Sequence, residues 1–165
     1  MRLVVCDTGP VLHLRKAGAL GLLAKTGDLL IPPAVNNELA SRIPNWTNAR
    51  PDWLRIGMLT AEDIRQARRS QAIGELGAGE AEAIALARSA RADWLLTDDA
   101  GARIVASLLG LEAHGSLGVV LWGAASGHVQ RAEAFAALEG LARSSLWVSP
   151  RIVDEAKQAL NRLVP

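Results

Sequence analysis

A strand and a helix follow one another in the stretch LVVCDTGPVLHLRKAG, at residues 3–18. Its first four residues have the length and apolar character of a short buried strand. Pro10 has the position of a first helical residue, with Thr8 or Gly9 as the helix cap, and Gly18 ends the helix. Asp7 is therefore predicted at the junction of a buried strand and a helix.

The same alternation of short apolar runs and helical stretches continues along the chain, which is typical of a mainly parallel sheet covered by helices. Further strands are expected at 28–32, at 53–59 on an edge of the sheet, at 93–97, weakly at 112–115, and at 146–149 (LWVS). Helices are expected at 20–24, 33–42, 60–72, 80–90, 102–109, 117–126 and 131–143 and from Pro150 onwards, with a loop at 44–53. We therefore predict an α/β fold, a three-layer α/β/α sandwich around a central, mainly parallel sheet of four or five strands.

Length and composition bound the class of protein. The chain has 165 residues, so residues 1–165 are expected to form one domain, with the C-terminal helices from about 128 to 165 as its extension. Half of the residues are hydrophobic, which excludes a disordered chain. Cys6 is the only cysteine, which excludes a disulfide framework and a cysteine-based zinc site. No signal peptide or membrane span is apparent, so a soluble cytoplasmic protein without a membrane contact is expected.

Carboxylates follow several of the predicted strands. Asp7 is the first residue after the first strand, and Asp98 and Asp99 directly follow the strand DWLLT. Glu38 lies on the helix after the second strand, and Glu80 opens the helix after the glycine turn LGAG. Ligands of parallel α/β sheets bind beyond the carboxyl ends of the strands. We therefore expect these side chains to meet in one negative pocket.

Such a pocket has a defined chemistry. Clustered carboxylates raise each other's pKa unless a cation offsets their charge. Hard, oxygen-rich sites without lysine or arginine suit Mg²⁺ or Mn²⁺. One ion, or two ions roughly 4 Å apart, can orient a water and stabilise both oxygens of an in-line phosphodiester cleavage. The predicted reaction class is metal-assisted hydrolysis.

Each acid also has a purely structural interpretation. The aspartates can cap helices, and Glu38 can be a solvated helix residue. Glu80 and Glu82 can interact with the helix dipole alone. Residues two apart lie about 200° apart around a helix, so only one of these two glutamates can point into the pocket. Glu80 is nearer the turn and is the predicted one.

Four segments together resemble the PIN-domain nucleases, particularly prokaryotic PIN domains of the VapC-like toxin ribonuclease branch: VVCDTGPVLHLRKAG, IPPAVNNEL, LGAGEAEAIALA and WLLTDDAGAR. The segment GSLGV at 115–119 resembles one prokaryotic branch of that family. The resemblance covers about residues 2–127. It implies a three-layer fold and carboxylates that bind Mg²⁺ or Mn²⁺ for the cleavage of RNA.

The resemblance also assigns roles by position. It implies the catalytic acids Asp7, Glu38, Glu80 and Asp99 and the metal ligands Asp7, Glu80, Asp98 and Asp99. Thr8 and Thr97 match small hydroxyl residues beside these acids and are supporting residues. The sequence departs from the family at two points: Glu80 stands where relatives often have aspartate, and the pair Asp98-Asp99 leaves the fourth ligand open between them.

The basic and aromatic residues suggest how RNA would be held. The net charge is only +1, but 15 arginines stand against three lysines, and arginine suits bidentate phosphate contacts. The candidates for phosphate contacts are Arg15, Lys16, Arg42 and Arg103, each with a solvated surface charge as the alternative. Arg65, Arg68 and Arg69 form a denser patch that can equally pair with an acidic partner protein. Trp46 and Trp53 can stack on bases or belong to the core.

The sequence also bears on the partners of such a ribonuclease and on alternative functions. Many toxins that the chain resembles are homodimers neutralised by a cognate antitoxin, so both partners are expected, and the helix LGVVLWGAA is either a dimer surface or core. A non-catalytic PIN scaffold that binds a protein is the first alternative. An aspartate-based phosphotransfer domain fits worse because Gly9 stands where a second acid is needed. No P-loop and no serine hydrolase elbow is present.

Overall fold

A five-stranded sheet forms the centre of the computed structural model, which describes residues 1–74 and 76–164. Its strands are β1 (Leu3–Cys6), β2 (Asp28–Ile31), β3 (Leu54–Ile56), β4 (Trp94–Leu96) and β5 (Ala113–His114). All neighbouring strands are parallel, in the order β3-β2-β1-β4-β5. The predicted parallel sheet, with its third strand at an edge, is confirmed.

Helices connect these strands and follow the last one. They are α1 (Thr8–Lys16), a 3₁₀ turn (Leu20–Leu22), α2 (Leu23–Thr26), α3 (Pro33–Arg42), α4 (Trp46–Ala49), α5 (Ala61–Gly74), α6 (Ala78–Ser89), α7 (Ala100–Leu108), α8 (Ser116–Ala125), α9 (Arg131–Ala142) and α10 (Pro150–Leu163). None of the helices within the described residues is both long enough and apolar enough to cross a membrane.

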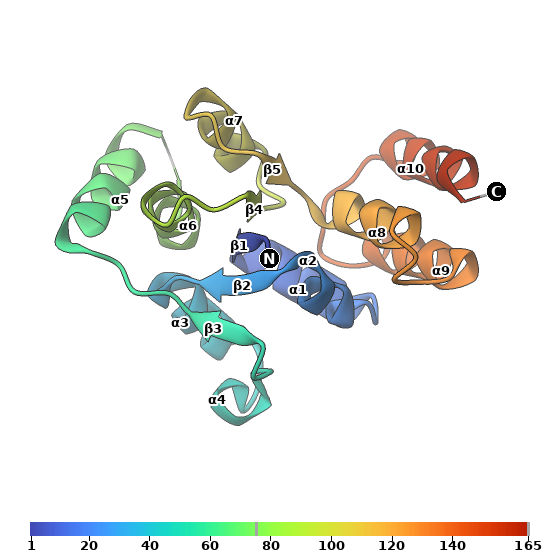
Figure 1. The fold of residues 1–165 in the computed structure, drawn as a ribbon, viewed down its shortest axis with the longest axis horizontal. Coiled ribbons are helices and arrows are strands. Elements are labelled where there is room, and N and C mark those ends of the chain that lie inside the picture. The colour runs from blue at the N-terminus through green and yellow to red at the C-terminus, as the bar shows by residue number, and fades with distance from the viewer. Residues whose placement is uncertain (75, 165) are drawn as a thin grey trace.

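The sheet separates two hydrophobic clusters, because successive side chains of a strand point to opposite faces. Val4 and Cys6 of β1 belong to the cluster formed with α1, α3, α8, α9 and α10. Val5 between them belongs to the cluster formed with α5, α6 and α7. Figure 1 shows these two groups of helices on either side of the strands. The predicted three-layer α/β/α sandwich is therefore confirmed.

Three local predictions are wrong. Residues 146–149 form no strand and instead connect α9 to α10, since Leu146 packs on the core whereas Trp147 is 93% exposed. Within the predicted loop at 44–53, residues 46–49 form α4, whose Trp46 is buried. Helix α1 begins before Pro10, because the Asp7 carboxylate accepts a hydrogen bond from the Thr8 amide at 2.7 Å and caps the helix.

Two other helices are capped at their N-termini by side chains. The amide of Thr60 donates to Asp63 at 2.8 Å, and the amide of Asp63 donates to the Thr60 hydroxyl at 3.2 Å, which is the reciprocal pattern of a capping box. Ser149 accepts from the amide of Ile152 and begins α10, with Pro150 as its first residue. These caps define where α5 and α10 start.

The packing of α9 on α1 gives a test of the core. A Cβ at Gly140 would lie 2.9 Å from the Cα of Ala17, a backbone atom that cannot move aside cheaply. We expect Gly140→Ala to lower the free energy of unfolding by about 1–3 kcal/mol through overpacking. In Gly118→Ala, on α8, the nearest atom would be 3.8 Å away. That matched variant should gain roughly 0.5–1 kcal/mol from helix propensity. Chemical denaturation of both variants measures the difference, and equal effects would contradict this packing.

Candidate active site at the carboxyl edge of the sheet

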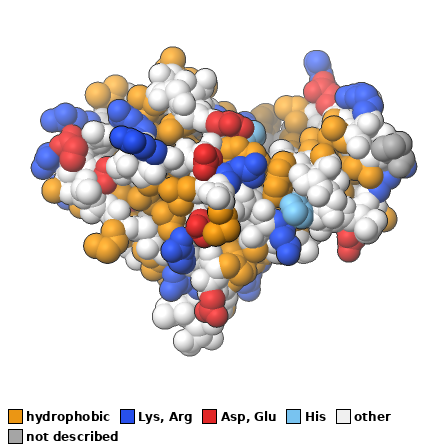
Figure 2. All heavy atoms as spheres, in the orientation of Figure 1, with side chains coloured by type: hydrophobic (Ala, Val, Ile, Leu, Met, Phe, Trp, Pro, Cys, Tyr) orange, Lys and Arg blue, Asp and Glu red, His pale blue; other side chains and the backbone are white. Residues whose placement is uncertain are grey.

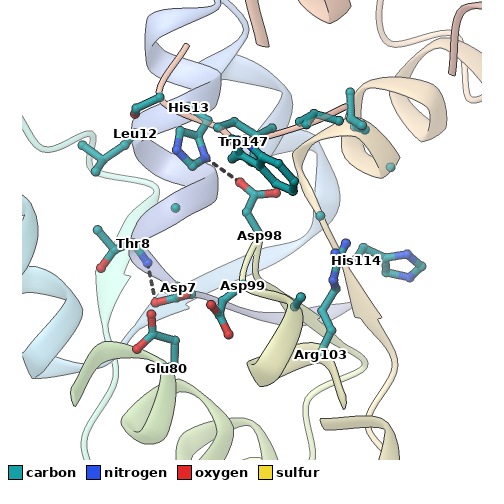
Figure 3. A pocket seen from close by; sticks show the side chains of 18 of the residues that line it. Asp7, Thr8, Leu12, His13, Glu80, Asp98, Asp99, Arg103, His114 and Trp147 are labelled. Atoms are coloured by element: carbon teal, nitrogen blue, oxygen red, sulfur yellow. Dashed lines mark hydrogen bonds and ion pairs between the residues drawn. The ribbon is translucent and has the colours of Figure 1, made fainter. Parts of the chain in front are cut away.

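The strand order opens a crevice between β1 and β4. The chain continues from β1 to β2 on one side, while β4 and β5 lie on the other, so the carboxyl ends of β1 and β4 form a topological switch point. A cavity of about 760 Å³ lies there. All five acids predicted from sequence line it: Asp7, Glu38, Glu80, Asp98 and Asp99. Figure 3 shows Asp7, Glu80, Asp98 and Asp99 in this cavity.

Asp7 is the most deeply buried of these acids, with 3% of its surface exposed. Its Oδ1 accepts the Thr8 amide at 2.7 Å, and its Oδ2 accepts the Thr97 hydroxyl at 3.0 Å. Burial, together with the charges of Glu80 and Glu38, raises the pKa of Asp7 to about 7, despite the hydrogen bonds from Thr8 and Thr97 that lower it. Thr97 and Thr8 thus fix Asp7 without neutralising it.

The glycine turn before α6 gives Glu38 and Glu80 room in the cavity. Glu38 Oε1 accepts the Gly79 amide at 3.0 Å, and Glu38 Oε2 accepts the Thr8 hydroxyl. A Cβ at Gly79 would lie 2.8 Å from both of these carboxylate oxygens, and a Cβ at Gly77 would collide with the Glu80 carboxylate. The sequence alone predicts LGAG only as a glycine turn. Its glycines leave space for the carboxylates of Glu38 and Glu80.

Glu80 and Glu82 point in different directions, as their spacing on a helix requires. Glu80 lines the cavity, whereas Glu82 accepts a hydrogen bond from the Ala34 amide at 2.8 Å at the start of α3. The structure therefore places Glu80 with the acid cluster and gives Glu82 a structural contact.

Asp98 and Asp99 also have different surroundings. Asp98 accepts hydrogen bonds from the Ser116 amide and hydroxyl, both at 2.6 Å, and lies 2.7 Å from His13 Nδ1. Its burial raises its pKa, but the hydrogen bonds from His13 and Ser116 outweigh that effect and lower the pKa below its usual value. Asp99 is exposed and caps α7 through the Ala102 amide at 2.7 Å. Asp98 thus ties α1 to α8, and Asp99 is the more exposed of the two at the cavity.

His13 and Ser116 were not predicted as site residues. His13 lies on α1 two turns after Asp7, and Ser116 is the first residue of α8. Their role was not visible because it requires three segments distant in sequence to meet at Asp98. The only signal in the sequence is a second aspartate next to the expected one.

Two of the four basic residues predicted for RNA contacts line the cavity. These are Arg42 at the end of α3 and Arg103 on α7, both exposed. Arg15 and Lys16 are exposed but do not line it, and Lys16 Nζ donates to Ser145 Oγ at 3.0 Å. No lysine or arginine of the described residues forms an ion pair with Asp7, Glu38, Glu80 or Asp99.

The aromatic and apolar candidates lie elsewhere. Trp46 is 2% exposed and donates to Asn36 Oδ1 at 3.0 Å, and Trp53 packs partly buried against the same core, so neither presents a face to the cavity. Helix α8 packs in the core through Val119 and Val120, and Leu121 and Trp122 are partly buried against that core. Arg65, Arg68 and Arg69 are exposed on α5, where Figure 2 shows basic side chains gathered.

The carboxylates of the cavity suit a hard divalent cation, although their oxygens are not arranged around a common point as metal ligands are. Four carboxylates without a basic partner share one cavity, and Asp7 has a raised pKa, so a cation would relieve their repulsion. As the side chains stand, no three His, Cys, Asp or Glu residues in the described part of the chain form a group that could hold a metal ion. Metal binding therefore requires the flexible Glu38 and Glu80 side chains to turn toward Asp7 and Asp99.

Comparison with known families agrees with this arrangement. A family model described as a PIN domain matches residues 3–162. The chain belongs to the PIN-domain family. PIN domains are generally nucleases, which typically use divalent metal ions, and the match extends through α9 into α10. No curated protein matches the sequence.

The raised pKa of Asp7 predicts a pH dependence of stability without metal. The pKa of Asp7 is higher in the folded chain than its ordinary value of 3.8, so the protonated carboxyl stabilises the fold. This contribution to stability is fully present below about pH 4 and is lost as the pH rises through about 7. The difference between 3.8 and about 7 corresponds to roughly 4 kcal/mol. With a chelator at about pH 8, Asp7→Asn should raise the free energy of unfolding by about 1–3 kcal/mol, since the amide carries no charge. Urea denaturation at several pH values measures this, and a variant less stable at every pH would contradict it.

Substitutions of the two neighbouring aspartates should lower the free energy of unfolding by different amounts. Asp98→Ala leaves Ser116 and His13 without their partner, and we expect a loss of about 2–4 kcal/mol in unfolding free energy. Asp99→Ala removes one helix cap and should cost about 1 kcal/mol. Thermal and chemical denaturation in the presence of a chelator compares the two variants. Equal losses would show that Asp98 is not the structural member of the pair.

Proposed function

We propose that this PIN domain is a metal-dependent endoribonuclease that hydrolyses RNA phosphodiester bonds at the cavity between β1 and β4. The observation that carries the proposal is the meeting of Asp7, Glu38, Glu80 and Asp99, from four separate segments, in one cavity without a basic partner. A fold has no structural need to gather four acids in this way, because their mutual repulsion opposes folding. The arrangement is useful where a divalent cation is bound.

Mg²⁺ or Mn²⁺, as one or two ions, is the proposed cofactor. Asp7, Asp99 and Glu80 would hold it, and Glu38 would complete the negative environment. When bound, such an ion supplies an activated water and neutralises charge on the phosphate. The Thr8 amide and the Thr97 hydroxyl keep both oxygens of Asp7 in fixed positions. Asp98 supports the neighbouring Asp99 through Ser116 and His13, and is a positioning residue in this proposal.

Arginines at the rim would supply the contacts to the substrate. Arg42 and Arg103 line the same cavity as the acids but pair with none of them in the described residues, so their guanidinium groups remain available to phosphates. Such phosphate contacts hold nucleic acid without reading its sequence. RNA rather than DNA as the substrate rests on the resemblance to toxin ribonucleases.

Cleavage of a mixed RNA pool tests the proposal. In the presence of Mn²⁺ or Mg²⁺, we expect Asp7→Asn, Glu80→Gln and Asp99→Asn to lower the cleavage rate by about 100-fold or more, because each removes a charged ligand. Glu38→Gln should act in the same direction. A chelator should abolish cleavage by the unaltered protein. The rate of appearance of new RNA ends is the measurement.

Glu155→Gln is the matched control, since Glu155 is an exposed acid on α10 that pairs with Arg151 and does not line the cavity. It should cleave like the unaltered protein. Equal cleavage by the control and by all the site variants would identify a contaminating nuclease and remove the main support for the assignment.

A non-catalytic scaffold is the second candidate, and the side-chain positions give it one argument. Glu38 already hydrogen bonds to Thr8 and Gly79, and the acids do not form a ready metal site. A scaffold should show no heat of Mn²⁺ binding in calorimetry, whereas a nuclease should bind Mn²⁺ and lose that binding in Asp99→Asn. An aspartate-based phosphotransfer domain gains no such argument from the structure.

We further propose, on the resemblance alone, that the protein acts in the cytoplasm as the toxin of a toxin–antitoxin pair, as a homodimer held inactive by a cognate antitoxin. The exposed arginines of α5 offer a surface for an acidic partner. Light scattering measures the mass of the protein in solution, and purification from its own cells would recover an antitoxin.

A further inference from the structure

An exposed tryptophan shares the cavity with the acids. Trp147 lies in the connection between α9 and α10, is 93% exposed and lines the same cavity as Asp7, Glu80 and Asp99. In Figure 3 it lies across the cavity from Glu80, on the side of His13 and Asp98. Burying an indole contributes more free energy than burying most side chains, so an indole left in water at a cavity offers a large contact surface to a ligand.

The residues around Trp147 hold it in this position. Ser145 accepts a hydrogen bond from Lys16 of α1 at 3.0 Å, and Leu146 packs against the hydrophobic core. On the other side, Ser149 caps α10. The connection thus has contacts with the rest of the fold before and after Trp147, and the indole between them is exposed.

The composition of this wall differs from that of the acid cluster. Leu117, Leu146 and Val148 line the same cavity as Trp147, and so does Ile152, which lies on the first turn of α10 and is 48% exposed. Arg103 also lines the cavity, and its guanidinium lies near Gly115 rather than in an ion pair. An apolar, aromatic wall beside acids and an unpaired arginine matches a ligand that carries a flat ring, a phosphate and an adjacent reactive bond. A nucleotide in a single strand has these three parts.

We propose that Trp147 forms a base-stacking subsite that selects single-stranded RNA, and that Arg103 contacts a phosphate of the same strand. This subsite rests on the proposed function and specifies its substrate. An indole stacks on the flat face of any base with little sequence preference. A paired base in a duplex has both faces covered by its neighbours, so the subsite favours unpaired strands.

Binding to oligonucleotides that lack one base tests the subsite. All proteins carry Asp99→Asn so that the RNA stays intact, and the probes are a labelled short single strand and a series with one abasic nucleotide at each successive position. We expect Trp147→Ala to weaken binding of the intact strand by about 5- to 150-fold, and Trp147→Phe to retain most of the affinity. For the parent, one abasic position should cause a comparable loss, and this loss should vanish in Trp147→Ala.

Two controls test whether a loss of affinity is specific to Trp147 and to single-stranded RNA. Met58→Ala removes an apolar side chain that is 89% exposed but does not line the cavity, and its affinity should stay unchanged. Duplex RNA of the same sequence should bind equally to the parent and to Trp147→Ala. Unchanged binding of the single strand by Trp147→Ala, or an equal loss on the duplex, would overturn the subsite. A change of mass in light scattering that accompanies the lost affinity would also overturn it and assign Trp147 to an interface between copies of the chain.

The two proposals can fail separately. If the unaltered protein does not cleave RNA but Trp147 governs binding of single strands, the subsite stands and the nuclease assignment fails. If the unaltered protein cleaves RNA with metal and Trp147→Ala binds the single strand as tightly as its parent, the nuclease assignment stands and the subsite fails.

Discussion

Repulsion among carboxylates at the carboxyl edge of the sheet is the constraint around which this end of the molecule is built. Asp7 is buried at the end of the central strand β1, and burial with the nearby charges of Glu80 and Glu38 raises its pKa to about 7. The surrounding fold supplies amides and hydroxyls from Thr8, Thr97 and Gly79, which are neutral donors. Neutral donors orient the acids and leave their charge uncompensated, which is the state that a divalent cation would relieve.

The adjacent residues Asp98 and Asp99 at the end of β4 have different roles, one in local structure and one at the cavity. Asp98 is drawn into hydrogen bonds with His13 and Ser116 and so links α1, the end of β4 and α8. Asp99 caps α7 with one oxygen and remains exposed at the cavity. The two residues have the same chemistry and differ only in the direction that the backbone gives them. A charged side chain that is fully hydrogen bonded stabilises the local structure, whereas its neighbour keeps ligand capacity.

Much of the fold follows from local patterns in the sequence. The alternation of apolar runs and helical stretches predicts all five strands, and the acids after the strands predict which side chains line one cavity. Local patterns do not show where a side chain points. LWVS has the composition of a strand, but Leu146 packs on the core, Trp147 faces solvent and the segment has no neighbouring strand to pair with. For the same reason, the choice between Asp98 and Asp99 and the contacts of Glu38 with Gly79 required the tertiary structure.

The cavity combines two parts of the chain that lie far apart in the sequence. The acids lie between residues 7 and 99, within the motifs that resemble PIN nucleases, whereas the apolar wall includes residues 145–149 after α9. The C-terminal helices pack on the same core as β1 through Leu138, Leu141 and Leu160. Their packing therefore fixes the position of the wall relative to the acids. In such an arrangement the sheet edge provides the acids, and the connection between α9 and α10 provides an apolar wall of the same cavity.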